Sequence, residues 1–223
     1  MELSSYLSFK YSVQVIRSDD TTSHQLLGGM EAPSAQYGFW KSMGTRDAVH
    51  TIRRAQEYVE RSGEKTAFML LDWGKGFETL CHRKLFTAMQ RIGVLKELID
   101  ATKALYAQPE FRVVDAHGQS AWQLQQEGIR QGCPLSPYLF VIATTVMFAD
   151  IRQNAGVDRL PKPGNINTAG ILYADDTILI TSTSQAMTKY LHQVECISAQ
   201  YRMRLNRKKC ELLCMSCKCT VNF

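Results

Sequence analysis

Residues 170–181, GILYADDTILIT, place two adjacent carboxylates inside an otherwise apolar stretch. Apolar residues at 171–173 and 178–180 flank Asp175 and Asp176, so the pattern predicts two short strands joined at the acidic pair. Two carboxylates about 4 Å apart repel by roughly 4 kcal/mol at an effective dielectric near 20. That is a large share of the typical stability of a domain, about 5–15 kcal/mol. Some compensating feature is therefore expected at this pair.

Three arrangements would relieve the repulsion. The pair can lie in a polar turn between the two strands, where water screens the charges. One aspartate can pair with a lysine or an arginine. Divalent cations can neutralise both, since hard oxygen ligands suit Mg²⁺. This stretch alone leaves all three open.

The composition is that of an ordinary globular protein, with 45% hydrophobic and 21% charged residues among 223. That length accommodates one large domain or two small lobes around a sizeable core. No run approaches the roughly 20 apolar residues of a membrane span, so we expect no membrane partner. The formal net charge of +5 weakly favours a polyanionic partner.

The amino terminus and the cysteines bear on localisation. The first twenty residues lack a basic start followed by an apolar block, so no secretory signal is expected. Seven cysteines, an odd and scattered number, favour reduced thiols over a disulfide scaffold. Four of them gather near the carboxyl end in a spacing that fits no common zinc pattern: Cys210, Cys214, Cys217 and Cys219. We expect an intracellular protein, cytoplasmic or nuclear and not secreted.

Apolar periodicity and turn residues predict strands and helices in alternation. A helix is expected over 45–62, capped by Thr45 and stopped by Gly63, with an inner face of Ala48, Val49, Ile52, Ala55 and Val59. Further along we expect a strand over 66–73, helices over 79–92, 94–106, 138–151 and 184–203, and a hairpin of 111–114 with 122–126. Ser184 is the expected cap of the last helix, and Trp122 is expected to pack within the hairpin. Because the strands also form hairpins, the expected fold class is α+β.

A third carboxylate, Asp72, ends the apolar stretch 66–73 and is followed by a tight Gly-Lys-Gly-Phe turn. Taken alone, Asp72 could cap the next helix or pair with Lys75. Together with the acidic pair, it gives three carboxylates that a sheet could bring to one edge. Such a group can hold two metal ions about 3.5–4 Å apart for in-line phosphoryl displacement.

The loop 127–140, EGIRQGCPLSPYLF, is the third informative segment. Gly132 lets a backbone come close to a ligand, and Gln131 could donate its amide to a sugar or a base. Prolines 134 and 137 stiffen the entry to a helix whose N-terminal N–H groups suit an anion. An ordinary loop–helix junction would contain the same residue types.

Five segments resemble the motifs of reverse transcriptases, in the order and approximate spacing of that family. LYADDTILI resembles the Y-x-D-D motif, and GIRQGCPLSPYLF resembles R-Q-G-x-P-L-S-P-x-L-F. FMLLDWGKGFETL is similar to the first palm motif, QYGFWKSMGTRDAVHTI to the fingers segment and LNRKKCELL to a later palm motif. The resemblance covers about residues 36–213, and R-Q-G-C-P-L-S-P is typical of the non-LTR retrotransposon and group II intron types.

The resemblance implies an α+β polymerase palm, with an antiparallel sheet backed by helices, plus partial fingers. The implied fingers elements are about 36–65 and 108–130, and the palm is about 66–107 and 131–213. The implied activity is RNA-directed DNA synthesis, adding dNTPs to a primer 3′-hydroxyl by two-metal phosphoryl transfer. Its implied partners are an RNA template, a DNA primer and dNTPs, together with other domains of a longer retroelement polyprotein.

The resemblance also assigns the catalytic carboxylates, residue by residue. Asp72 and Asp175 correspond to the metal ligands, with the backbone carbonyl of Trp73 beside them. Asp176 corresponds to a neighbouring catalytic carboxylate that assists electrostatically. The implied cofactor is a pair of Mg²⁺ ions, with Mn²⁺ as an alternative, and no covalent enzyme intermediate is expected.

The remaining implied site residues bind nucleotide or nucleic acid. The implied nucleotide-binding group is Lys41, Gly74, Lys75, Gly76, Phe77, Gln131, Gly132 and Lys209. The ring of Phe77 would exclude a ribose 2′-hydroxyl, and Lys209 would meet the triphosphate or protonate pyrophosphate. The implied primer and template contacts are Tyr173, Arg130 and Pro134. Trp122 of the fingers hairpin could also touch the template, although a packing role is the favoured reading.

Departures from the family pattern qualify these expectations. Trp40 and Lys41 follow Phe39 where an arginine is usual. Gly74, Gly76 and Glu78 replace Ser, Ala and Asp, which predicts a looser turn. Residues 1–35 form a divergent or truncated lead, residues 214–223 form a Cys-rich tail, and no thumb follows the late palm motif, so a fragment is expected. The alternatives are an RNA-dependent RNA polymerase, disfavoured by Phe77 and Tyr-Ala-Asp-Asp, and a catalytically inactive nucleic-acid-binding remnant of a retroelement.

Overall fold

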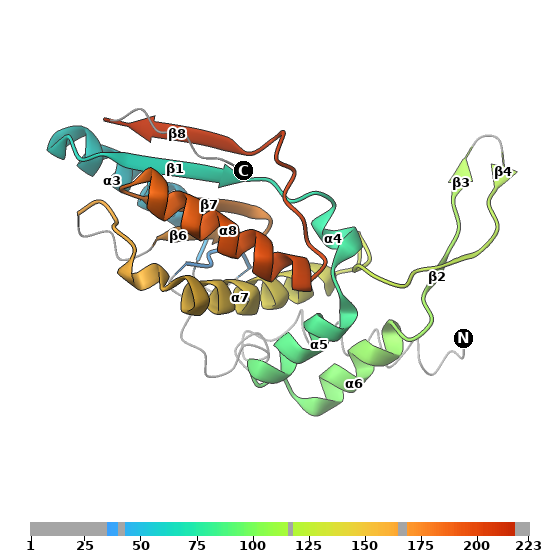
Figure 1. Ribbon diagram of the computed structural model, residues 1–223. Helices are drawn as coiled ribbons and strands as arrows, with labels where there is room; N and C mark the ends of the chain where they lie inside the picture. Colours follow the sequence, from blue (N-terminus) through green and yellow to red (C-terminus); the bar gives the residue numbers. More distant parts are fainter. Residues whose placement is uncertain (1–34, 40–42, 116–117, 165–168, 217–223) are drawn as a thin grey trace.

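The computed structural model describes residues 35–39, 43–115, 118–164 and 169–216 (Figure 1). The helices are α3 (Thr45–Ser62), α4 (Gly76–Thr79), α5 (His82–Arg91), α6 (Lys96–Leu105), α7 (Ser136–Ala155) and α8 (Ser184–Gln200), with a 3-10 turn η1 (Val157–Arg159). The longer strands are β1 (Thr66–Leu71), β6 (Gly170–Tyr173), β7 (Asp176–Thr181) and β8 (Glu211–Met215). Four two-residue strands are β2 (Glu110–Phe111), β3 (Val114–Asp115), β4 (Gly118–Gln119) and β5 (Gln123–Leu124).

The four longer strands form one antiparallel sheet in the order β6-β7-β1-β8. The register pairs Leu71 of β1 with Thr177 of β7, and β6 pairs with β7 as a hairpin. The carboxyl end of β1 and the turn between β6 and β7 therefore meet at one edge of the sheet. This mixed architecture confirms the α+β expectation.

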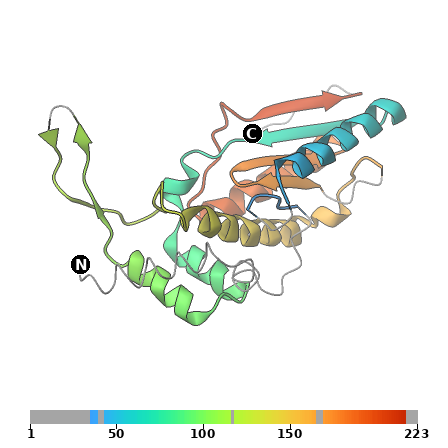
Figure 2. The same cartoon turned by 180° about the vertical axis from the view of Figure 1, so that it is seen from behind.

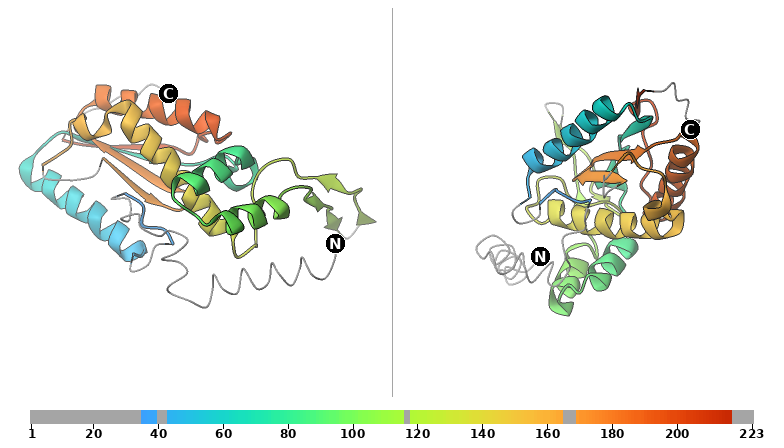
Figure 3. Two further views of the ribbon diagram at one scale, coloured as in Figure 1. Left: turned by 90° about the horizontal axis from the view of Figure 1, so that it is seen from below. Right: turned by 90° about the vertical axis from the view of Figure 1, so that its left-hand side faces the viewer.

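Helices cover both faces of the sheet (Figures 2 and 3). On one face α3 packs over Phe68, Ile171 and Ile180. On the other face α7 and α8 form the main core, and α5 packs on the far side of α7. Thirteen of the twenty residues of α7 are buried, because α7 lies between the sheet and α5. Within the described ranges no helix is long and apolar enough to cross a membrane.

Several predicted boundaries shift in the structure. Gly44 rather than Thr45 caps α3, and Gly63 ends it as expected, in the left-handed conformation with φ 68°. The cap of α8 is Thr183 rather than Ser184, because its side-chain oxygen accepts the Ala186 N–H. The periodic pattern could not resolve these ends, since neighbouring residues have similar capping chemistry.

Two further predictions about side chains and helices are wrong. Val49 of α3 is 40% exposed, although it was expected on the inner face. The helix expected over 79–92 is instead two helices, α4 and α5, separated at Leu80 and Cys81. Leu80, in the break between the two helices, is fully buried, so its side chain packs in the core.

The expected hairpin is present and extends away from the body of the molecule (Figures 1 and 2). It consists of β2, β3, β4 and β5, and we call this segment, residues 108–127, the arm. Glu110 pairs with Leu124, and Val114 pairs with Gln119. Trp122 is 58% exposed, so the expectation that it packs inside the hairpin is wrong.

A polar network joins three helices on the far side of α7. The guanidinium of Arg91 donates two hydrogen bonds to the carboxylate of Asp150, at 2.8 and 2.6 Å. Tyr201, just after α8, donates its hydroxyl to the same carboxylate at 3.5 Å and is 2% exposed. Burial and the neighbouring Asp150 charge raise the pKa of Tyr201 to about 12.

Alkaline conditions should therefore destabilise the protein through Tyr201. Below about pH 10 the phenol is protonated in both states; between pH 10 and 12 the unfolded chain ionises first, so stability falls as pH rises. We expect Tyr201→Phe to lose less free energy of unfolding than the wild type between pH 9 and 11, by an amount on the order of 1 kcal/mol. Urea titrations at each pH measure this, and parallel losses in both proteins would contradict it.

Candidate active site

The acidic pair lies at a two-residue hairpin turn. Tyr173 of β6 pairs with Asp176 of β7, so Ala174 and Asp175 form the turn between the strands. Ala174 adopts a left-handed backbone, φ 55°, which costs an L residue roughly 1–2 kcal/mol. The expected strand–turn–strand arrangement is confirmed, and the turn carries Asp175 to the edge of the sheet.

Asp72 lies at the same edge. It directly follows Leu71, whose partner across the sheet is Thr177, so the next position along β7 is Asp176. The pKa of Asp176 is raised, first by partial burial and then by the charges of Asp175 and Asp72. The fold thus brings the three carboxylates into one electrostatic environment, as the sequence predicted.

Among the residues that the structure describes, no cationic side chain forms an ion pair with these carboxylates. In particular, Lys75 does not pair with Asp72. Within the same ranges no group of three or more His, Cys, Asp or Glu side chains is placed so that the side chains alone could hold a metal ion. The donor set is nevertheless that of a hard divalent cation, since it consists of carboxylate oxygens whose mutual repulsion such an ion would relieve.

Backbone hydrogen bonds hold the Asp72 segment in place. The Gly74 N–H donates to the carbonyl of Arg204 at 2.8 Å, and the Asn206 N–H donates to the carbonyl of Asp72 at 2.8 Å. These two bonds flank a bridge between Trp73 and Leu205, and neither of them uses the Trp73 carbonyl. The side chain of Trp73 is buried and donates to the Thr177 hydroxyl at 3.3 Å.

The same pairing places a basic segment beside Asp72. Lys209 and its neighbours Arg204 and Lys208 are exposed there. The run R-x-R-x-x-R-K-K over 202–209 was visible in the sequence, but only Lys209 was singled out. Cys210 is partly buried, accepts the Asp72 N–H at 3.5 Å and has its thiol pKa raised mainly by burial.

The Gly-Lys-Gly-Phe turn differs from the looser loop that its glycines predicted. Lys75, not a glycine, takes the left-handed conformation, with φ 57°. A Cβ on Gly76 would lie 3.3 Å from the ring of Phe140, so the absence of a side chain permits close packing on α7. Phe77 stacks on Phe140 with ring centroids 4.4 Å apart and planes 8° from parallel. The ring of Phe77 is therefore fixed by the core.

Backbone hydrogen bonds also hold the loop before α7 against α4. We call this loop, residues 128–135 with Arg130, Gln131 and Gly132, the R-Q-G loop. The Gly128 N–H donates to the Leu80 carbonyl at 2.9 Å, and the Ile129 N–H donates to the Phe77 carbonyl at 2.6 Å. The Gln131 amide donates to the Glu78 carboxylate at 3.2 Å. The loop that carries Gln131 and Gly132 is thus positioned directly against the turn that carries Phe77.

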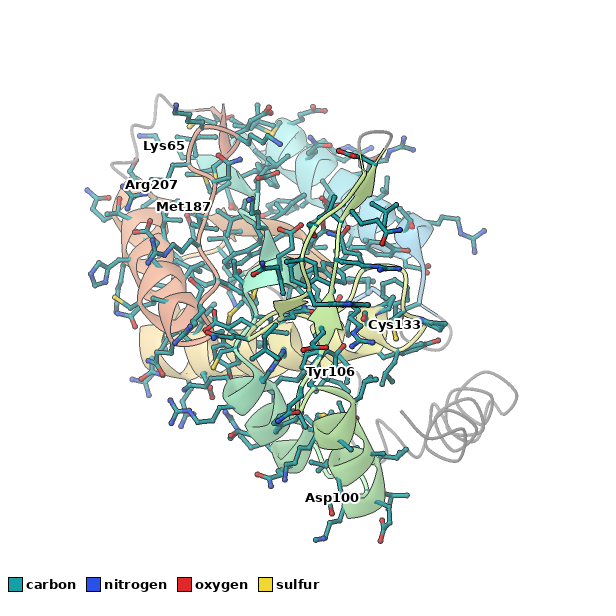
Figure 4. The ribbon with its side chains drawn as sticks, turned by 90° about the vertical axis from the view of Figure 1, so that its right-hand side faces the viewer. Lys65, Asp100, Tyr106, Cys133, Met187 and Arg207 are labelled. Atoms are coloured by element: carbon teal, nitrogen blue, oxygen red, sulfur yellow. The ribbon has the colours of Figure 1, made fainter. Side chains whose placement is uncertain are left out.

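His82, at the start of α5, makes a specific contact with this loop. Its Nε2 lies 2.6 Å from the carbonyl oxygen of Gly128, and its ring packs against Tyr106. The Arg130 N–H donates to the Tyr106 hydroxyl at 3.4 Å. Tyr106 and Cys133 lie on the side of the molecule from which the arm extends (Figure 4). No sequence periodicity could have revealed the His82 contact, because its partner is a backbone atom.

A segment from the amino-terminal part of the described chain supports the acidic turn. The Leu172 N–H donates to the Ala35 carbonyl at 2.7 Å, and the Tyr37 N–H donates to the Leu172 carbonyl at 2.8 Å. A Cβ on Gly38 would lie 2.6 Å from the backbone nitrogen of Ala174. Only glycine fits this approach without displacing the turn that carries Asp175.

The other predicted site residues are less closely gathered. Pro134 is exposed at the loop before α7, and Gly132 has open space around it, with φ 79°. Tyr173 is half-buried on the face of the sheet that α3 partly covers. Lys41 and Trp40 lie outside the described residues, as do Cys217, Cys219 and all but one residue of the expected 1–35 lead.

Two glycines of the R-Q-G loop make a matched pair for testing the tie to α4. A Cβ on Gly128 would meet the Glu78 carbonyl at 2.3 Å, whereas a Cβ on Gly132 would meet nothing within 4 Å, although both have positive φ. Gly132→Ala should cost about 1 kcal/mol for its conformation, and Gly128→Ala roughly 2–4 kcal/mol because backbone atoms must also move. Urea denaturation measures both; equal losses would contradict the close approach at Gly128.

Comparison with known proteins gives one family match over most of the chain. The model of the family described as reverse transcriptase (RNA-dependent DNA polymerase) matches residues 16–221. The transposon TX1 uncharacterized 149 kDa protein of Xenopus laevis is 28% identical over 73% of this chain and 12% of its own length. The RNA-directed DNA polymerase from mobile element jockey of Drosophila funebris is 25% identical over 80% of this chain and 19% of its own length.

Solved structures share the fold at low sequence identity. The telomerase of Candida albicans, in complex with the TWJ fragment of telomeric RNA, superimposes with a TM-score of 0.64 at 15% identity, covering 96% of this chain and 38% of that one. The apo telomerase of Candida tropicalis, truncated from its C-terminal domain, gives a TM-score of 0.61 at 12% identity, covering 97% and 41%. The chain therefore spans less than half the length of these structural neighbours.

Proposed function

Because the chain belongs to the reverse transcriptase (RNA-dependent DNA polymerase) family, we propose that it is the fingers–palm part of an RNA-directed DNA polymerase of a retroelement. The observation that carries the proposal is the meeting of Asp72, Asp175 and Asp176 at one sheet edge, where no ion pair within the described part of the chain neutralises them. A nucleic-acid polymerase needs such an edge to hold divalent cations at the reacting phosphate.

In this proposal Asp72 and Asp175 hold two Mg²⁺ or Mn²⁺ ions, together with the Trp73 carbonyl. When bound, such ions would lower the pKa of the primer 3′-hydroxyl and offset the negative charge of the leaving pyrophosphate. Asp176 adds negative charge beside these ligands and so favours the ions over water. The hydrogen bond from Asn206 to the Asp72 carbonyl fixes the backbone that presents Asp72.

The turn after Asp72 forms the proposed nucleotide pocket. The N–H groups around Gly74, Lys75 and Gly76 line the triphosphate, and the exposed Lys209 lies on the segment beside them. Phe77 lies beneath the sugar, and its stacking on Phe140 keeps the ring from yielding to a 2′-hydroxyl. Gln131 and Gly132 complete the pocket, together with Lys41 from the fingers segment.

The proposed template and primer contacts are Arg130 and Pro134 on the R-Q-G loop and Tyr173 beside the acidic turn. We assign about 36–65 and 108–130 to the fingers, and about 66–107 and 131–213 to the palm. The relatives are several times longer than this chain, so we propose that further domains of a retroelement polyprotein act with it. We propose that it acts on its RNA template in the cytoplasm or the nucleus.

Primer extension tests the carboxylate assignment. On poly(rA)/oligo(dT) with dTTP and Mg²⁺, Asp175→Asn should lower the extension rate by about 10²–10³-fold, since it removes an ion ligand worth several kcal/mol in the transition state. Asp100→Asn, an exposed aspartate on α6 that pairs with Lys96, is the matched control and should retain the rate. Extension that survives Asp175→Asn would refute the site, and RNA–DNA binding without any extension by the wild type would indicate an inactive remnant.

Sugar selection tests the role of Phe77. Replacing the ring with the smaller side chain in Phe77→Val should open room for a ribose hydroxyl and raise rUTP use relative to dTTP use by at least ~10-fold, because only a steric clash is removed. Phe86→Val, a partly buried ring of α5 outside the pocket, is the control for a general packing defect. Equal use of both nucleotides by the wild type would contradict the proposed gate.

A further inference from the structure

The backbone pairing of β1 with β7 ends just before the carboxylates. The last paired residues are Leu71 of β1 and Thr177 of β7. Beyond Leu71 the backbone bonds to the segment on the other side of β1, where the Asn206 N–H donates to the Asp72 carbonyl at 2.8 Å. The separation between Asp72 and the turn that carries Asp175 therefore depends on contacts other than this ladder.

A side-chain hydrogen bond joins the two segments beyond that point. The indole N–H of Trp73 donates to the hydroxyl oxygen of Thr177 at 3.3 Å. Both residues are buried, with exposed fractions of 8% and 2%. The ring of Trp73 also meets the ring of Phe148 on α7 edge-on, with centroids 6.3 Å apart and planes at 83°. The hydrogen bond is therefore enclosed in the core, and α7 packs against it.

These two residues directly follow two of the carboxylates and lie on the opposite face of the sheet. Trp73 follows Asp72, and Thr177 follows Asp176. Leu71, the partner of Thr177 in the register, belongs with Trp73 to the main core under α7 and α8. Because successive side chains alternate across a strand, Asp72 and Asp176 face the other side. The Trp73–Thr177 bond thus lies behind the carboxylates, on the core side of the sheet.

We propose that the Trp73–Thr177 hydrogen bond sets the separation of Asp72 from Asp175 and Asp176, and thereby the affinity of this edge for divalent ions. The proposal rests on the proposed function and adds two positioning side chains to it. Mutual repulsion pushes the carboxylates apart, so neighbouring contacts must fix their separation. Mg²⁺ demands near-ideal octahedral geometry, so a small displacement of one carboxylate lowers its affinity. A bond held within the packed core resists such a displacement.

The role requires the polar bond and not only the bulk of the two side chains. A buried N–H that loses its acceptor is costly, so in Thr177→Val the indole must move or admit water. Thr177→Ser keeps a hydroxyl at the same position and should keep the bond. Thr145 of α7 supplies a matched control, because its buried hydroxyl has no hydrogen-bond partner among the described residues. Thr145→Val makes the same chemical change where no bond is lost.

Direct ion binding gives the first test. Electron paramagnetic resonance measures free Mn²⁺ as the full chain is titrated without nucleotide, and the binding lost in Asp175→Asn is the binding that belongs to this edge. Thr177→Val should weaken that binding about 5-fold, which is the effect of losing one neutral hydrogen bond. Thr177→Ser and Thr145→Val should stay within about 2-fold of the wild type, since neither loses a bond.

A second variant tests the bond from its other side. Trp73→Phe removes the donor and leaves the Thr177 hydroxyl, so it should also weaken Mn²⁺ binding. Adding Thr177→Val to Trp73→Phe should weaken the binding little further, because the bond is already lost. Circular dichroism checks that each variant folds, and Trp73→Phe carries the test if Thr177→Val does not.

Primer extension gives a second readout. Thr177→Val should need about 5-fold more Mg²⁺ for half-maximal extension, and saturating Mg²⁺ should return its rate to within about 2-fold of the wild-type rate. A general packing defect would instead lower the rate at every Mg²⁺ concentration.

The remaining outcomes decide against the proposal or against the function on which it rests. Wild-type Mn²⁺ affinity in a folded Thr177→Val or Trp73→Phe would overturn the proposal. An equal loss in Thr145→Val, or a Thr177→Val rate that added Mg²⁺ does not restore, would overturn it as well. Mn²⁺ binding that depends on Asp175 and Thr177, without extension by the wild type, would contradict only the polymerase function. Extension that is lost in Asp175→Asn but has an unchanged Mg²⁺ requirement in Thr177→Val would contradict only the role of the bond.

Discussion

Like-charge repulsion at the edge of the sheet is the constraint on which the rest of the molecule depends. Asp72, Asp175 and Asp176 come from two segments about 100 residues apart, and the chain must hold them together against their own electrostatics. It does so almost entirely with neutral backbone contacts. A cation of the protein at this edge would relieve the strain, but it would also occupy the place where divalent ions are needed.

The supporting contacts share one physical character. The acidic turn is held by the approach of Gly38 to the backbone of Ala174, and Asp72 is held by backbone bonds to Arg204 and Asn206. The R-Q-G loop is held by the approach of Gly128 to α4. Main-chain contacts fix position more tightly than long side chains, which lose entropy when they are ordered. Motifs that are separate in the sequence thus form one connected backbone framework around the carboxylates.

Much of this framework could be anticipated from residue patterns. Short apolar runs predicted β1, β6 and β7, and the three aspartates marked the strand ends that meet. Periodicity could not predict contacts made with backbone atoms, such as that of His82 with the Gly128 carbonyl. Nor could it tell which of two adjacent capping residues begins a helix, as with Thr183 in place of Ser184. It also misjudged Trp122, since an aromatic residue in a hairpin packs inward only if a second layer covers it, and the arm extends beyond any layer. The left-handed conformation of Lys75 was also unforeseen. The flanking glycines, Gly74 and Gly76, were the expected positions for a left-handed backbone, because glycine adopts it without steric cost.

The burial of α7 bears on how the protein folds. A helix with an apolar stripe on one side can rest on a half-formed core, but α7 has apolar neighbours around most of its circumference. It can become stable only when the sheet, α5 and α8 close around it together, so these elements form one cooperative unit. The amide hydrogens of α7 would exchange with solvent only on opening of that whole unit, whereas those of the arm would exchange through local fraying. The molecule thus combines a core that opens as a whole with an arm that can change shape while the core stays closed.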